Sequence, residues 1–309
     1  MKTIESFKKT ITVIGSCNTD MVIKSERLPA PGETILGGTF LMNPGGKGAN
    51  QAVAAARMGS NVNFVAKTGD DLFGKQSVEL YKAEGIKTDY IFTDAENPSG
   101  VALITVDAKG ENCIVVASGA NGTLSTENID KARSAIEAAS IVLMQLEIPI
   151  ETVEYVAEMA FREGIKVILN PAPAQKLSDK LLQCLHIIIP NSTEAEILSG
   201  IKVNDWASAK AAANAISAKG VDIVVLTLGA QGALIKEGDR FYEVAAEKVT
   251  AVDTTAAGDT FCGALCVGIS EDMSVVDAAK MACKASAISV TKMGAQASIP
   301  YRKELRIEN

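Results

Sequence analysis

The 309-residue sequence lacks the features of several protein classes. It has one histidine, His186, and a single imidazole cannot build a metal site that needs several. No apolar run approaches the ~20 residues of a membrane helix, and residues 1–9 lack the apolar segment of a signal peptide. We therefore expect a cytoplasmic protein that has no membrane partner and whose catalysis does not depend on histidine.

An excess of positive charge is also missing. The net charge of -7 disfavours nucleic acid or an anionic membrane as the main partner. The cysteines show no CxxC spacing, which disfavours a zinc site and a disulfide framework. We predict that all six are buried free thiols, namely Cys17, Cys113, Cys184, Cys262, Cys266 and Cys283.

Short β-branched runs alternate with helical patterns along most of the chain. The strand-like runs are 11–14, 62–66, 141–144, 167–169, 187–189 and 223–226. The helical patterns are 49–58, 77–84, 150–162, 206–218 and 275–290. This alternation predicts an α/β fold with a central, mostly parallel sheet that is flanked by helices on both faces.

Two stretches of the first half interrupt that alternation. Residues 21–41 contain Pro29, Pro31 and Gly32, and residues 99–117 alternate apolar and polar positions around a turn. Neither stretch could form a core alone. We expect a single domain over residues 1–309, with these strands inserted as a small β-sheet lid.

A glycine-rich segment, residues 43–51, leads into an alanine-rich helical pattern. Its glycines, including Gly46, let the backbone approach a ligand closely, while Lys47 and Asn50 supply donors for hydroxyls or phosphate. The same letters are compatible with a tight turn before a packing helix.

A second small-residue segment ends in an acidic residue. Successive N–H groups of Ala256, Ala257 and Gly258 at a helix start can form an anion hole for a phosphoryl group in transfer. Asp259 then stands where a general base can accept the proton of a hydroxyl. The alternative is that Asp259 is only the N-cap of the helix.

Two further segments follow predicted strands, where open α/β sheets bind their ligands. Asn191 and Glu194 could hold Mg²⁺ through water, although a Ser/Thr cap with acidic residues in the first helical turn explains the same pattern. Thr227, Gly229 and Gly232 offer a hydroxyl and glycine backbone to a nucleotide, and equally form a β-turn.

One apparent phosphate loop is rejected. Residues 69–76 fit the glycine and lysine spacing of a Walker A loop, but Gln76 replaces the hydroxyl residue that holds Mg²⁺. Asp70 and Asp71 inside the loop would repel phosphates. We expect an ordinary loop and helix start.

The two glycine-containing signatures, 45–51 and 253–259, resemble those of the ribokinase, or phosphofructokinase-B, family of sugar kinases. Further family-like segments follow in the same order over nearly the whole chain and leave only about the first ten residues outside the resemblance. These segments are 15–20, 31–34, 69–71, 110–112, 119–121, 145–147, 191–194 and 294–296.

The resemblance implies a role for each matching residue. Sugar hydroxyls would be held by Asn18, Asp20, Gly46, Lys47, Asn50 and Glu147, with Asp259 as the base. ATP would contact Asn191, Thr227, Gly229, Gly232, Gly258 and, near the adenine, Cys283, with Mg²⁺ close to Asn191 and Glu194. A monovalent cation, usually K⁺, would be bound by Asp253, Thr255, Ser289, Lys292, Gly294 and Ser298, several of them through backbone carbonyls.

The expected activity is transfer of the γ-phosphoryl of ATP to the 5-hydroxyl of D-ribose, which gives D-ribose 5-phosphate and ADP. Deoxyribose, another sugar or a nucleoside are alternative acceptors within the same family. A sugar-binding sensor without catalysis is an alternative of another class. Since the edges of a lid sheet invite pairing, and the family commonly pairs there, we also expect a homodimer joined through the lids.

Overall fold

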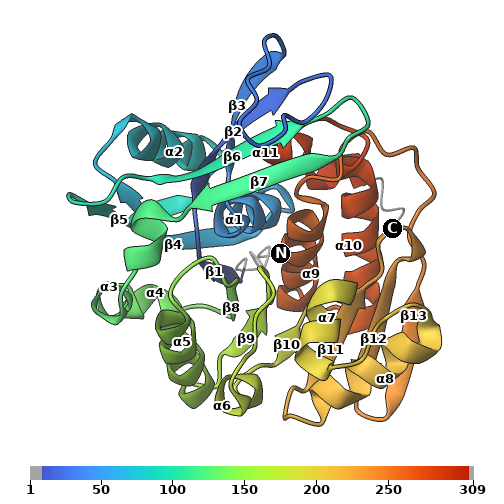
Figure 1. Ribbon diagram of the computed structural model, residues 1–309. Coiled ribbons are helices and arrows are strands. Elements are labelled where there is room, and N and C mark those ends of the chain that lie inside the picture. Colours follow the sequence, from blue (N-terminus) through green and yellow to red (C-terminus); the bar gives the residue numbers. More distant parts are fainter. Residues whose placement is uncertain (1–8, 306–309) are drawn as a thin grey trace.

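The computed structural model describes residues 9–305 (Figure 1). Its main sheet has nine strands in the order β13-β12-β11-β10-β9-β8-β1-β4-β5. The seven from β11 to β5 are parallel, while β12 pairs antiparallel with both β11 and β13. The bounds are β1 (Thr10–Ile14), β4 (Asn61–Gly69), β5 (Lys87–Asp94), β8 (Ile141–Met144), β9 (Lys166–Leu169), β10 (Ile187–Ile188), β11 (Ile223–Thr227), β12 (Ala233–Glu237) and β13 (Arg240–Val244). The predicted mostly parallel sheet is confirmed.

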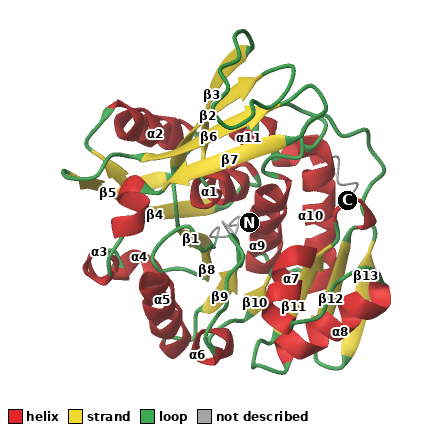
Figure 2. Cartoon of the chain, viewed as in Figure 1, coloured by secondary structure: helices red, strands yellow, loops and turns green. Residues whose placement is uncertain are grey.

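Helices cover both faces of this sheet (Figure 2). One apolar cluster joins the sheet to α1 (Lys47–Arg57), α2 (Leu72–Ala83), α9 (Ala257–Ser270) and α10 (Val275–Ser289). A second cluster joins the other face to α3 (Thr126–Lys131), α4 (Arg133–Glu137), α5 (Ile150–Arg162), α6 (Asp179–Gln183), α7 (Ser192–Ser199) and α8 (Trp206–Ser217). Side chains alternate between the faces, since Val13 belongs to the first cluster and Ile14 to the second. Both faces are therefore buried, as a parallel sheet requires.

A separate four-stranded sheet lies over one edge of the main domain (Figure 1). Its order is β3-β2-β6-β7, with β2 and β6 parallel and the other pairs antiparallel. The strands are β2 (Asn18–Lys24), β3 (Thr39–Gly45), β6 (Gly100–Val106) and β7 (Asn112–Ala117). The strand pair β2 and β3 thus extends beyond the expected residues 21–41 at both ends, which places Asn18 and Gly45 in this sheet. We call this sheet the lid.

Some elements differ from expectation. Cys113 lies exposed on β7, so the prediction that all six cysteines are buried is wrong for this residue; a strand of a two-sided, uncovered sheet cannot bury it. The antiparallel pair β12 and β13 and several short elements were not predicted: η1 (Gly119–Thr123), η2 (Gly229–Gln231), η3 (Arg302–Leu305) and α11 (Ala295–Ser298).

Within residues 9–305, no helix combines the length and apolarity that a membrane crossing needs. The expectation drawn from residues 1–9 about a signal peptide falls almost entirely outside the described residues.

Candidate active site

Three cavities are lined by residues that follow the central strands or belong to the lid. The central cavity, about 230 Å³, is lined by Lys47, Asn191, Glu194 and Asp259, among others. The apolar cavity, about 420 Å³, shares Thr227, Thr254, Ala257 and Gly258 with the central one. The lid cavity, about 450 Å³, is lined by residues that include Asn18, Asn121 and Glu147. Most of the residues predicted from the sequence therefore line one of three cavities.

Asp259 is not the cap of its helix. The N-cap of α9 is Ala256, and Asp259 lies in the first turn with only 7% of its surface exposed. Its Oδ2 accepts a hydrogen bond from Asn50 Nδ2 at 2.9 Å, and its Oδ1 accepts one from Gln51 Nε2 at 3.0 Å. The capping alternative is wrong because the carboxylate faces α1 and the central cavity.

The start of α9 is shaped for an anion. Ala256 has a φ of 59°, a left-handed conformation that costs a non-glycine residue roughly 1–2 kcal/mol. The N–H of Ala257 already donates to Thr254 O at 3.2 Å, so this predicted anion-hole donor is engaged. The N–H groups of Ala256 and Gly258 have no acceptor among residues 9–305. Of the three N–H groups, the two of Ala256 and Gly258 are therefore the ones available to an anion.

The expected sugar residues meet where the lid joins α1. Asn18, Asp20 and Asn50 are buried, with at most 9% of their surface exposed. Asn50 Oδ1 is buried and accepts no hydrogen bond from the described part of the chain. A buried acceptor without a donor costs about 1–3 kcal/mol, which a ligand hydroxyl would recover. Glu147 Oε2 accepts hydrogen bonds from Ser16 Oγ at 2.5 Å and from the backbone N–H of Lys47 at 3.0 Å.

Glycine is required at the start of α1. Gly46 has a φ of 87°, and a Cβ there would lie 2.7 Å from the backbone nitrogen of Asn18. The close approach brings the glycine-rich segment against the first lid strand.

Carboxylates crowd this region. Burial, together with the charges of Glu147 and Asp259, raises the pKa of Asp20 to about 6, although the charge of Lys47 acts to lower it. The pKa of Lys47 is raised, chiefly by the charge of Asp259, so its ammonium group stays protonated. The Lys47 side chain lines the central cavity together with Asn191 and Glu194. This places its charge on the side of the expected phosphates.

The apolar cavity is lined by most of the residues expected to contact the nucleotide, whereas Asn191 lines the central cavity. Thr227, Gly229, Gly232 and Cys283 all line the apolar cavity. Gly232 has a φ of 103°, and a Cβ there would lie 2.0 Å from Val244 O, so the chain can turn tightly only with glycine. The remaining lining is largely apolar and includes Ala246, Val249, Phe261, Ala287 and Val290. A flat aromatic base suits such a surface.

Asn191 and Glu194 are engaged with each other. Asn191 caps α7, its Oδ1 accepting from Glu194 N at 2.9 Å, and Glu194 accepts from Asn191 N and Nδ2 at 2.8 Å. The cap is thus Asn191 rather than the Ser or Thr that follows. Both residues also line the central cavity, so the capping box and a role near phosphate are compatible.

The expected cation residues come from three segments: Asp253 and Thr255 precede α9, Ser289 ends α10, and Lys292, Gly294 and Ser298 follow α10. Asp253 accepts hydrogen bonds from the backbone N–H groups of Thr255 and Gly294, each at 2.9 Å. Burial alone would raise the pKa of Asp253, but these hydrogen bonds lower it, so the carboxylate is ionised. Ser289 and Ser298 are fully buried, whereas the Lys292 ammonium pairs with Glu304 at 2.7 Å. An ionised carboxylate oxygen is the kind of ligand that a hard cation prefers.

A chain of buried amides behind Asp259 was not predicted. Gln51 Nε2 also donates to Asn170 Oδ1 at 3.0 Å, and Gln51 Oε1 accepts from Gln145 Nε2 at 2.6 Å. Asn170 Nδ2 donates to Ile189 O at 3.0 Å. Gln51 and Gln145 belong to family-like segments, but those segments do not indicate that Gln51 contacts Asp259 or that Gln145 contacts Gln51.

The rejected phosphate loop is an ordinary helix start. Lys75 pairs with Asp70 at 2.9 Å, and both side chains are well exposed. Asp71 caps α2 by accepting from Gly74 N at 2.8 Å, and it also accepts from Ser99 N and Oγ. The carboxylates occupy the loop that phosphates would need.

Comparisons with known proteins agree with this geometry. Residues 8–302 match the family model described as pfkB family carbohydrate kinase. The chain is 46% identical over 297 residues to a ribokinase of Haemophilus influenzae, covering 96% of this chain and 97% of that protein. It is 39% identical over 291 residues to a deoxyribokinase of Salmonella typhimurium, covering 94% and 95%. A structure of Arabidopsis thaliana ribokinase complexed with ribose and ATP superposes with a TM-score of 0.89 at 31% identity, covering 97% and 98%.

Proposed function

The chain belongs to the pfkB family of carbohydrate kinases, and we propose that it transfers the γ-phosphoryl group of ATP to the 5-hydroxyl of D-ribose. The observation that carries the proposal is the position of Asp259. Its buried carboxylate lines the central cavity and accepts hydrogen bonds from Asn50 and Gln51 of the sugar-side helix α1. It is therefore the group best placed between a sugar and a phosphate.

The reaction needs little covalent chemistry from the protein. Asp259 accepts the proton of the 5-hydroxyl while that oxygen bonds to the γ-phosphorus and the bond to the β-phosphate oxygen breaks. The N–H groups of Ala256 and Gly258 and the ammonium of Lys47 neutralise the charge on the transferred group. The products are D-ribose 5-phosphate and ADP.

The sugar is held by groups of both polarities. Asn50 Oδ1 accepts from a hydroxyl, Asp20 and Glu147 accept as carboxylates, and Asn18 supplies an amide. Gly46 lets these groups approach one another. Closure of the lid over them would exclude water as a competing acceptor.

ATP would place its base in the apolar cavity against Cys283, with Thr227, Gly229 and Gly232 along its path to the central cavity. Asn191 and Glu194 would hold Mg²⁺ through water, and the ion would supply positive charge to the phosphates when bound. Glu194 is buried, which raises its pKa; a cation beside it would favour the charged form.

A monovalent cation such as K⁺ would be bound by the side chain of Asp253 with oxygens of Thr255, Ser289, Lys292, Gly294 and Ser298. Asp253 already ties the segment before α9 to Gly294. The cation would fix the shape of this loop and thereby the position of Gly258. Its effect on turnover would be indirect.

We further propose one domain over the chain, with the lid inserted, a cytoplasmic location and a homodimer joined through the lids. The lid exposes large apolar side chains, among them Phe40, Leu103, Ile114, Val115 and Val116, with 47–64% of their surface exposed. Its edge strands β3 and β7 have unpaired backbone groups. A second copy of the chain would cover both.

Steady-state kinetics over D-ribose, 2-deoxy-D-ribose, other sugars and nucleosides, with and without K⁺, tests the proposal. We expect the highest kcat/KM for ribose and a rise in turnover with K⁺. Strong preference for deoxyribose or a nucleoside would overturn the assignment of ribose. Calorimetric binding of sugar with no ADP release at saturating Mg-ATP would instead favour a sensor.

A further inference from the structure

A buried asparagine that the proposed reaction does not use lies directly behind the sugar residue Asn18. Asn121 belongs to η1, immediately after the last lid strand, and only 1% of its surface is exposed. Its Oδ1 accepts from Cys17 N at 2.9 Å, and its Nδ2 donates to Cys17 O at 3.1 Å and to Asn18 Oδ1 at 2.7 Å. All three bonds are buried.

The backbone of Cys17 fixes the direction of these bonds. Its N–H can only donate and its carbonyl can only accept, so the Asn121 amide has one allowed orientation. The remaining Nδ2 hydrogen of Asn121 then requires an acceptor, which is Asn18 Oδ1. If the Asn18 amide were flipped, two NH₂ groups would face each other. Asn18 must therefore direct its own Nδ2 elsewhere, and this group donates to no acceptor among residues 9–305.

Both ends of the β6–β7 hairpin meet at this contact. Gly100, the first residue of β6, pairs in register with Asn18. A Cβ at Gly100 would lie 2.2 Å from Asn121 Nδ2 and 2.2 Å from Asn18 Oδ1. The hairpin therefore starts against the Asn18–Asn121 hydrogen bond, and the chain returns to it just after β7 ends.

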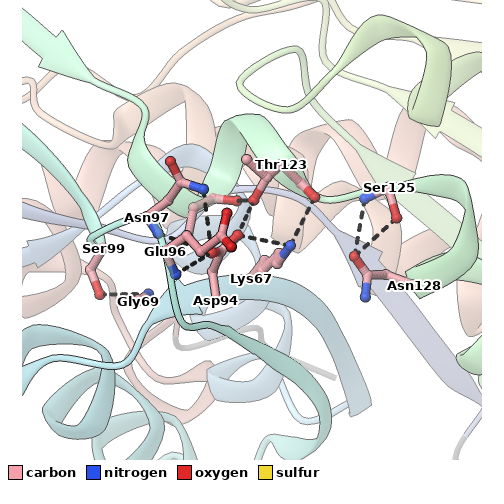
Figure 3. A network of polar contacts seen from close by, with 10 residues as sticks. Lys67, Gly69, Asp94, Glu96, Asn97, Ser99, Thr123, Ser125 and Asn128 are labelled. Carbon is pink, nitrogen blue, oxygen red and sulfur yellow. Dashed lines mark hydrogen bonds and ion pairs between the residues drawn. The ribbon is translucent and has the colours of Figure 1, made fainter.

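Hydrogen bonds and an ion pair connect the base of the β6–β7 hairpin to the main sheet (Figure 3). Thr123 Oγ1 donates to Asp94 Oδ2 at 2.6 Å, while Lys67 Nζ donates to Thr123 O at 3.1 Å and pairs with Asp94 at 2.9 Å. The Asp94 carboxylate also accepts from the N–H groups of Glu96 and Asn97. The hydrogen bond from Thr123, with those from Lys67 and the backbone, lowers the pKa of Asp94, so the network stays ionised near neutral pH. The segment that carries Asn121 is therefore held against the main sheet.

We propose that Asn121 is a positioning residue for sugar binding. It holds the Asn18 side chain so that Asn18 Nδ2, rather than Asn18 Oδ1, faces the lid cavity. Asn18 then acts as a hydrogen-bond donor, and it selects a substrate oxygen that can accept at that point. A substrate with a C–H group there would leave the NH₂ of Asn18 unpaired in a closed site, and it should bind on the order of tenfold more weakly. The inference deepens the proposed sugar kinase function and rests on it.

A double-mutant cycle tests this role. The variants are Asn121→Ala, Asn18→Ala and the double variant, and the measurements are the Kd for ribose by calorimetry, kcat and the thermal midpoint. We expect Asn121→Ala to weaken ribose binding on the order of tenfold, with kcat at saturation within about threefold. In the Asn18→Ala background, the same change should alter the Kd by less than about twofold. The proposal would be overturned if the effects of the two substitutions on the Kd for ribose were additive. It would also be overturned if either single variant bound ribose as the wild type does.

Two controls separate positioning from general destabilisation. Asn63→Ala also removes a buried amide, one that bonds Thr12 Oγ1 at 3.2 Å within the main sheet, and it should leave the Kd for ribose unchanged. If Asn121→Ala does not fold, Gly100→Ala tests the same Asn18–Asn121 hydrogen bond, because the added methyl group must displace this bond. Gly268→Ala is the matched control, since its methyl group would crowd Ala278 Cβ at 2.7 Å between α9 and α10 and not at the lid cavity. Equal effects of the two glycine variants on ribose binding would refute the proposal.

Assays of the wild-type protein distinguish a failure of this inference from a failure of the proposed function. Failure to release ADP with ribose and Mg-ATP would refute the kinase proposal, while the cycle would still report on sugar binding. If another sugar of the kinetic panel binds more tightly, the cycle is run with that sugar. Normal turnover of ribose combined with an additive cycle would refute only the role of Asn121.

Discussion

Gln51 Nε2 lies 3.0 Å from Asp259 Oδ1, and the direction of this hydrogen bond is set by a backbone carbonyl 138 residues along the chain from Gln51. Ile189 O can only accept, so it fixes the amide of Asn170, whose Oδ1 then accepts from Gln51. Gln145 donates to the other end of Gln51. A flipped Gln51 would place its oxygen against a carboxylate. The chain of amides therefore presents an N–H group to the proposed base.

We predict that Gln51→Met lowers kcat on the order of ten- to a hundredfold. Methionine keeps the length of the side chain but cannot donate to Asp259, so the carboxylate loses one of the two bonds that orient it. The Kd values for ribose and ATP should change by less than about threefold. Calorimetry and steady-state kinetics give both readouts, with exposed Gln76→Met as the control. An unchanged kcat would show that Asn50 alone orients the base.

For Asp259→Asn, we expect turnover to fall on the order of a hundredfold or more, with sugar and nucleotide binding nearly unchanged. The amide keeps the shape of the carboxylate but is a far weaker proton acceptor. Rapid-quench measurement of ADP formation at saturating substrates distinguishes a slower chemical step from slower product release. Retained turnover would remove Asp259 from the role of base.

The sequence predicted the parallel sheet well because its strands are short, β-branched and buried on both faces, as in residues 141–144. It did not predict β12 and β13, where the sheet turns antiparallel. The strand β13 (Arg240–Val244) is partly exposed and polar, and only the first three residues of β12 (Ala233–Glu237) are buried, so no long buried run marks either strand. The ends of the first lid pair were also missed, because Asn18 and Gly45 lack strand propensity and are held there by pairing with each other.

The motifs predicted which residues belong to the site, but not which residues those side chains contact. Asp259 was equally compatible with an N-cap until its carboxylate was found to face Asn50 and Gln51. Asn121 and Asn170 act through contacts across more than a hundred residues, or through a neighbouring strand end, and no local pattern encodes such contacts. Lys47 is expected to contact the sugar, and it lines the central cavity together with Asp259.

Lys47→Ala should weaken ATP binding or slow phosphoryl transfer by at least about tenfold, whereas Lys75→Ala should leave both nearly untouched. Lys47 carries its charge into the central cavity, while Lys75 only pairs with exposed Asp70, and such surface pairs contribute at most about 1 kcal/mol to stability. Equilibrium binding of a fluorescent ATP analogue, together with kcat, measures the difference. A large loss of ATP affinity in Lys75→Ala would revive the rejected loop as a phosphate site.

Asp20→Asn should make the ligand-free protein more stable at pH 7.5 while weakening ribose binding on the order of tenfold. Burial, with the charges of Glu147 and Asp259, raises the pKa of Asp20 from 3.8 to about 6. Between these values the folded chain retains a proton that the unfolded chain has released, so stability from this group is lost as the pH rises toward 6. Above pH 6 the ionised group costs about 2 to 3 kcal/mol, which the neutral amide avoids.

The difference in thermal midpoint between Asp20→Asn and wild type should therefore be largest above pH 6 and shrink toward zero near pH 4. Exposed Asp89→Asn, on β5, serves as the control and should leave the midpoint unchanged across this range. Saturating ribose should reverse the order at pH 7.5, because a ligand that binds the wild type more tightly stabilises it more. A variant less stable than wild type at every pH would mean that the carboxylate is held by favourable contacts, and that its burial is structural rather than a cost of binding the sugar.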